Sequence, residues 1–131
     1  MCIAAGCDMR CLIVDDSAEF RDAASAMLER GGISVVGRAT NSAEALRCYE
    51  ALHPDIALVD IDLGGEDGFA LAEKLDQVSA ASRLAVILVS TYAESDLAEM
   101  IDESPAVGFL QKFLLSPDAI RDLLKGQRAS R

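Results

Sequence analysis

The chain has 131 residues, which is enough for one domain and too few for two of ordinary size. Apolar residues make up 51% of the sequence, which argues against disorder, and no apolar run approaches the ~20 residues of a membrane span. The 22 acidic and 12 basic residues give a net charge of −10. We therefore expect no direct binding to nucleic acid or to a membrane, and we predict a cytoplasmic protein.

Five short apolar runs have the length of β-strands. They cover residues 11–14, 33–36, 56–59, 84–89 and 107–110. Four of them consist almost entirely of apolar or small residues, as expected for strands that are covered on both faces. The run at 33–36 continues into Gly37 and Arg38 and is more polar, so we expect this strand at an edge of the sheet.

Between these runs, apolar residues recur at helical spacing. The helical segments centre on residues 20–28, 45–52, 71–75, 97–101 and 120–124. Asn41 with Glu44 fits a capping box, Ser116 fits an N-cap before Pro117, and Gly126 is placed to end the last helix. Because strand and helix alternate five times, the sequence predicts an α/β fold, a doubly wound five-stranded parallel sheet with helices on both faces.

One folded domain accounts for most of the chain. We expect it to cover residues 10–126, between a flexible N-terminus at 1–9 and a C-terminal tail at 127–131.

Polar side chains follow four of the apolar runs. Asp15 and Asp16 come after the first run, Asp60 after the third, Ser90 after the fourth and Lys112 after the fifth. Each has an ordinary structural explanation when taken alone, such as a helix cap or a surface lysine. In an open parallel sheet, however, the carboxyl ends of the strands meet, and three converging carboxylates require a cation or the protonation of one of them. Mg²⁺, which prefers oxygen ligands, fits this set best.

Asp60 is the natural nucleophile of such a site, since a carboxylate can accept a phosphoryl group as a mixed anhydride. Asp15 and Asp16 would then hold the metal ion. Phosphoryl transfer depends largely on positioning and electrostatic stabilisation. Lys112 would supply the cation, and Ser90 the hydroxyl donor, for the phosphoryl oxygens.

These residues resemble the receiver domains of bacterial two-component response regulators. The resemblance covers residues 10–125 and rests on the motifs at 12–16, 54–63, 67–68, 89–90 and 108–112. It implies a flavodoxin-like (βα)5 fold with strand order 2-1-3-4-5. It also implies that Asp60 is the phosphoacceptor, that Asp16 and Asp60 bind Mg²⁺ directly, and that Asp15 binds it through water. The backbone carbonyl of Asp62 would complete the metal site.

The resemblance also assigns the remaining site residues, with some departures from the family pattern. Ser90 and Lys112 would contact the phosphoryl group, and Ser90 and Phe109 would form the conformational switch. Phe113 stands where the family usually has a proline in a cis peptide, so we expect a trans bond after Lys112 or a shifted loop. A Gly64–Gly65 pair replaces the usual proline-glycine, which predicts a looser loop.

The implied function is signalling rather than enzymatic turnover, because the chain would assist only its own phosphorylation and dephosphorylation. Its donor would be a sensor histidine kinase or a phosphotransfer protein. Its output would be a downstream protein partner or an output domain missing from this chain, and phosphorylation could produce a homodimer.

Two alternatives remain open at this point. A haloacid-dehalogenase-like phosphatase would use Asp60 as its nucleophile, since residues 60–63 also fit that group's motif, although its nucleophile lies on the first strand. A flavin-binding electron carrier would need a phosphate-binding loop after the first strand, where Asp15 and Asp16 instead repel phosphate.

Overall fold

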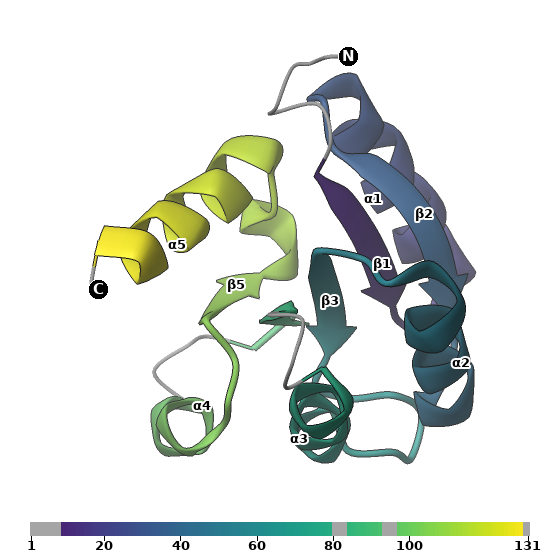
Figure 1. Ribbon diagram of the computed structural model, residues 1–131, viewed down its shortest axis with the longest axis vertical. Helices are drawn as coiled ribbons and strands as arrows, with labels where there is room; N and C mark the ends of the chain where they lie inside the picture. Colours follow the sequence, from purple (N-terminus) through teal and green to yellow (C-terminus); the bar gives the residue numbers. More distant parts are fainter. Residues whose placement is uncertain (1–8, 80–83, 93–96, 130–131) are drawn as a thin grey trace.

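Strands and helices alternate along the chain (Figure 1). The computed structural model describes residues 9–79, 84–92 and 97–129. The strands are β1 (Arg10–Val14), β2 (Ser34–Ala39), β3 (Ile56–Asp60), β4 (Ala85–Ser90) and β5 (Gly108–Gln111). The helices are α1 (Ala18–Arg30), α2 (Ser42–Leu52), α3 (Gly68–Val78), α4 (Ala98–Glu103) and α5 (Pro117–Ala129), and a short 3₁₀ turn covers Lys112–Leu114. All five predicted strands and all five predicted helices are therefore confirmed.

The strands form a parallel sheet in the order β2-β1-β3-β4-β5. This order confirms both the predicted fold class and the edge position of the second strand. The chain winds outward in one direction from β1 to β2 and in the other from β3 to β5, so the direction of winding reverses between β1 and β3. The carboxyl ends of these two neighbouring strands form the rim at which open α/β sheets bind their ligands.

The sheet separates two apolar cores. Alternate residues of β1 point to opposite faces, with Leu12 and Val14 in one core and Cys11 and Ile13 in the other. Side chains from α2, α3 and α4 cover the first face, and those from α1 and α5 cover the second. Every residue of β3 and β4 is buried, which explains why these runs are continuously apolar in the sequence.

The helix starts follow the predicted capping chemistry. The Asn41 side chain accepts a hydrogen bond from the Glu44 amide at 2.9 Å, and Ser116 Oγ accepts one from the Ala119 amide at 3.0 Å. The Glu44 carboxylate reaches back to the Thr40 amide at 2.8 Å. Within the described part of the chain, no helix has the length and apolar character needed to cross a bilayer.

The predicted end of the last helix at Gly126 is wrong. Helix α5 continues to Ala129, so residues 127–129 of the predicted tail belong to its last turn. A single glycine costs a helix only about 1 kcal/mol relative to alanine, and it ends the helix only where the backbone turns left-handed. Residues 1–8 of the predicted flexible N-terminus, and residues 130–131, lie outside the described part of the chain.

Helix α3 begins in very close contact with the end of β3. A Cβ atom placed on Gly68 would overlap the Asp60 carbonyl oxygen and would lie 2.5 Å from Ile61 Cα. Backbone atoms cannot move aside as a flexible side chain can. Gly68 therefore allows the helix to start directly against the residue that carries the candidate nucleophile.

This contact predicts that Gly68→Ala lowers the free energy of unfolding by ~1–3 kcal/mol, because the added methyl group must displace α3 from β3. Gly126→Ala is the matched control. It makes the same change within α5 and should raise stability by ~0.5–1 kcal/mol through helix propensity. Urea unfolding of the two variants measures both effects, and a stabilising Gly68→Ala would contradict the close contact.

Candidate functional site

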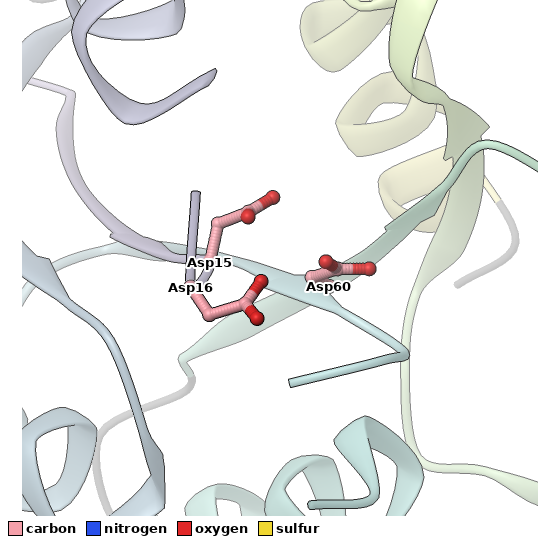
Figure 2. A group of neighbouring side chains, drawn as sticks. All are labelled: Asp15, Asp16 and Asp60. Carbon is pink, nitrogen blue, oxygen red and sulfur yellow. The ribbon is translucent and has the colours of Figure 1, made fainter. Parts of the chain in front are cut away.

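Three carboxylates lie together at the carboxyl ends of β1 and β3. Asp15 and Asp16 follow β1, and Asp60 is the last residue of β3. Figure 2 shows the three side chains projecting into the same region. Each offers an oxygen atom within 4.8 Å of those of the other two. Asp15 and Asp60 are buried and Asp16 is exposed, so the cluster has a closed inner side and an open outer side.

Lys112 reaches this cluster from the far edge of the sheet. Its Nζ atom lies 2.7 Å from Asp15 Oδ2 and 3.2 Å from Asp60 Oδ2. The described residues contain no cis peptide bond, in agreement with the trans bond expected between Lys112 and Phe113. The lysine therefore contacts both buried carboxylates despite the missing proline.

The electrostatics of the cluster are only partly compensated. The pKa of Asp60 is raised from 3.8 to about 6, chiefly by burial and also by the nearby Asp15 charge, which together outweigh the lowering effects of the Asp62 amide and of Lys112. Burial also lowers the pKa of Lys112, but the hydrogen bonds and charges of Asp15 and Asp60 outweigh this, so the pKa of Lys112 is raised overall. Negative charge remains in excess over the ammonium.

Asp15 Oδ2 is a buried oxygen with a single partner among the described residues. The Lys112 ammonium approaches it to 2.7 Å as an ion pair, and no other donor reaches it. A buried carboxylate oxygen in this condition carries a desolvation cost, which a metal ion or a metal-bound water could remove. We take this atom as structural support for a cation at the site.

The backbone around Asp15 fixes its orientation. Asp15 Oδ1 accepts a hydrogen bond from the Ser17 amide at 2.8 Å, and the Asp15 carbonyl accepts one from the Arg21 side chain at 2.6 Å. The Asp15 amide donates to the Ala39 carbonyl on β2 at 3.0 Å. Neighbouring elements thus bind both the backbone and the side chain of Asp15, and these hydrogen bonds restrict rotation of its carboxylate.

The loop between β3 and α3 contains a tight turn at Gly64–Gly65, and the looser loop expected for this glycine pair stays a prediction. Both glycines have positive φ values, 61° and 103°, and Leu63 and Glu66 exchange backbone hydrogen bonds across them at 3.0 and 3.4 Å. Two central residues of this kind make the compact turn typical of β-hairpins. The positive φ values therefore explain why glycine occupies both central positions of this turn.

This turn lies directly beside the carboxylates. A Cβ atom at Gly64 would lie 2.7 Å from Asp16 Oδ2, and the Asp62 amide donates to Asp60 Oδ1 at 3.2 Å. The Glu66 side chain accepts a hydrogen bond from the Ser42 amide at 2.8 Å and so ties the turn to the start of α2. The segment 62–66, which includes the candidate carbonyl ligand Asp62, is thus bound to Asp60 at its first residue and to α2 at its last.

An open cavity of about 220 Å³ adjoins the cluster. It is lined by Asp16, Asp60, Asp62, Gly64, Ser90, Thr91, Tyr92 and Lys112. Ser90 Oγ accepts a hydrogen bond from the Tyr92 amide at 3.0 Å, and its own proton can still be donated into the cavity. The cavity therefore brings together Asp16, Asp60, Ser90 and Lys112, whereas the buried Asp15 does not line it.

Phe109 lies apart from this cavity. It is only 6% exposed and packs in the core on the α4 side of the sheet, where it lines a different cavity of about 390 Å³ between α4, β5 and α5. Its role as a switch residue stays a prediction.

Two further residues at the site escaped the sequence analysis. The Glu66 side chain, in the loop between β3 and α3, accepts a hydrogen bond from the first residue of α2. Nothing in the sequence indicates that contact. Phe20 lies against Lys112. Its position in the first turn of the helix that follows Asp15 and Asp16 could have placed it near the acidic pair.

Comparisons with known proteins agree with this geometry. The model of the response regulator receiver domain family matches residues 11–125. The putative transcriptional regulator of Pseudomonas aeruginosa PAO1 is 32% identical over 101 residues, which are 77% of this chain and 48% of that protein. The transcriptional regulatory protein PdtaR of Mycobacterium tuberculosis is 32% identical over 116 residues, which are 88% of this chain and 53% of PdtaR. The chain thus spans about half the length of these curated relatives.

A solved structure shows the same arrangement. The signal receiver domain of the putative response regulator NarL from Mycobacterium tuberculosis matches with a TM-score of 0.77 and 31% identity. The match covers 90% of this chain and 97% of that domain. The likeness therefore extends over nearly the whole of both chains.

The raised pKa of Asp60 predicts how stability depends on pH when divalent cations are chelated. The carboxyl proton of Asp60 is bound more tightly in the folded protein than in the unfolded chain, so protonation of Asp60 stabilises the fold. This contribution to the free energy of unfolding is fully present below pH ~4 and is lost as the pH rises through about 6. Asp60→Asn should therefore raise the free energy of unfolding by ~1–3 kcal/mol above pH ~7, with little effect below pH ~4.

Urea unfolding across this pH range measures the difference. Asp76→Asn, at an exposed position of α3, gives the reference for loss of a charge elsewhere. A gain in stability for Asp60→Asn that is the same at every pH would contradict the assigned origin of the effect.

Proposed function

Since the chain belongs to the response regulator receiver domain family, we propose that it accepts a phosphoryl group on Asp60 and thereby changes its binding to a partner. The observation that carries this proposal is the position of the Asp60 carboxylate. It lies at the end of a central strand, beside a cavity, with Lys112 and two further carboxylates around it. This combination of nucleophile, cation and acidic cluster suits phosphoryl transfer.

We propose Mg²⁺ as the cation, in keeping with the acidic aspartate cluster by which receiver domains bind it. The residues fit this ion because their donors are carboxylate oxygens and because the buried Asp15 Oδ2 has only the Lys112 ammonium as a partner among the described residues. Asp16 and Asp60 would hold Mg²⁺ directly, Asp15 through water, and Asp62 through its backbone carbonyl. When bound, the ion would offset negative charge on the carboxylates and on the phosphoryl oxygens.

The residues of this chain would then perform the transfer as follows. A carboxylate oxygen of Asp60 attacks phosphorus, and a new P–O bond forms as the bond to the donor breaks. The Lys112 ammonium, already 3.2 Å from Asp60 Oδ2, stabilises charge on the phosphoryl oxygens. The Ser90 hydroxyl donates to a phosphoryl oxygen. Asp60 must be ionised to attack, and positive charge from Lys112 and the metal opposes the effect of burial on its pKa.

The partners follow from the same proposal. A sensor histidine kinase or a phosphotransfer protein would supply the phosphoryl group. A downstream protein, or an output domain outside this chain, would read the change, with a phosphorylation-dependent homodimer as a further form of output. The matched relatives named as transcriptional regulators extend well beyond the receiver region, which supports an output domain. The family match does not favour the haloacid-dehalogenase-like alternative.

Acetyl phosphate with Mg²⁺ should add a single phosphoryl group to the protein, detectable by intact mass spectrometry. Asp60→Asn should abolish the addition, and a chelator should suppress it in the unsubstituted protein. Asp55→Asn is the matched control, because Asp55 lies at the opposite end of β3 and should leave labelling intact. Equal labelling of Asp60→Asn and the unsubstituted protein would place the phosphoacceptor elsewhere.

Asp62→Asn should speed phosphorylation by small anionic donors by a few-fold. Asp62 is exposed and lines the cavity, so its charge repels an incoming anion. The effect should shrink at high salt, where such repulsion is screened. Asp76→Asn changes the net charge equally at a distant position and should leave the rate unchanged. A slower or unaltered rate in Asp62→Asn would count against this electrostatic effect.

A further inference from the structure

An aromatic ring lies beside the ammonium of Lys112. The Nζ atom is 4.6 Å from the centroid of the Phe20 ring, within the range of a cation–π contact. Phe20 is half-buried in the first turn of α1 and packs against the core on that side of the sheet. The next residue along from the lysine, Phe113, is 75% exposed and so contributes little packing to hold Lys112.

The ring belongs to a closed series of contacts around Asp15. Asp15 Oδ1 accepts from the Ser17 amide at 2.8 Å, and Ser17 Oγ accepts from the Phe20 amide at 3.2 Å. The Phe20 ring meets Lys112, whose Nζ returns to Asp15 Oδ2 at 2.7 Å. The start of α1 thus sets the position of the ring relative to the same aspartate that attracts the lysine.

The carboxylates and the ring hold the ammonium in different ways. Asp15 and Asp60 attract it by charge, but the proposed function requires the same carboxylates to share that charge with a divalent cation, which repels an ammonium. The Phe20 ring is neutral, and its attraction for a cation comes from the ring quadrupole. This attraction does not depend on whether the carboxylates are free or occupied.

We propose that Phe20 is a positioning residue for phosphoryl transfer, whose ring keeps the Lys112 ammonium beside Asp60 while the carboxylates bind a cation. The proposal rests on the function proposed above and extends it to α1. It also explains how Lys112 keeps its place in a chain where phenylalanine follows it instead of proline.

Three variants test this role. Phe20→Leu keeps an apolar side chain but removes the ring, and should slow phosphorylation by acetyl phosphate at saturating donor by about two- to ten-fold. Phe20→Tyr keeps the ring and should react at close to the unsubstituted rate. Phe69→Leu removes a half-buried ring from the first turn of α3, away from Lys112, and should leave the rate unchanged.

A spectroscopic measurement follows the contact itself in the metal-free protein. The ε-methylene protons of Lys112 should show an upfield ring-current shift in NMR spectra of the unsubstituted protein and of Phe20→Tyr, and should lose it in Phe20→Leu. Titration with Mg²⁺, followed by the amide shifts of Asp60 and Asp62, should show no loss of affinity in Phe20→Leu. If Phe20→Leu does not fold, Phe20→Met, which also lacks a ring, replaces it.

The outcomes separate this inference from the proposed function. An unsubstituted protein that is not phosphorylated would overturn the function. A phosphorylated protein in which Phe20→Leu loses the ring-current shift but reacts at the full rate would overturn the positioning role. Equal slowing in Phe20→Tyr and Phe20→Leu would also overturn it, because packing rather than the ring would then control the rate.

Discussion

Mutual repulsion among three carboxylates is the constraint to which the rest of the site responds. Parallel strands end at one edge of a sheet, so Asp15, Asp16 and Asp60 are brought together whatever their charges. Two of them are buried, which adds desolvation to the repulsion and raises the pKa of Asp60. The groups nearest to them are accordingly backbone amides and the ammonium of Lys112. The remaining negative charge is the feature that would attract the proposed Mg²⁺.

Short, well-fixed connections hold these groups in place. The absence of a side chain at Gly68 lets α3 begin against β3, and the Gly64–Gly65 turn brings backbone next to Asp16. The Glu66 side chain links the same turn to the start of α2. Because the amide donors and the candidate carbonyl ligand belong to rigid backbone, their positions depend little on side-chain rotamers. The site is therefore arranged before any ligand arrives.

The sequence predicts the fold and the composition of the site well because both follow from local patterns. Apolar runs mark buried parallel strands, and the residues after each run must meet at one rim. The error at Gly126 arises because a glycine late in a helix is compatible both with the end of that helix and with its continuation. The contact between Phe20 and Lys112 depends on side-chain directions in elements from opposite ends of the chain, which periodicity does not encode.

The ion pair between Lys112 and Asp15 has a consequence for the order of folding. It joins the residue after the first strand to the residue after the last, so it forms only when β5 has docked. During synthesis the N-terminal part of a domain emerges first. A nascent chain that ends after β4 already carries all three carboxylates but lacks the ammonium. The acidic cluster thus receives its ammonium only after the four preceding strands have been synthesised, with α5 still to follow.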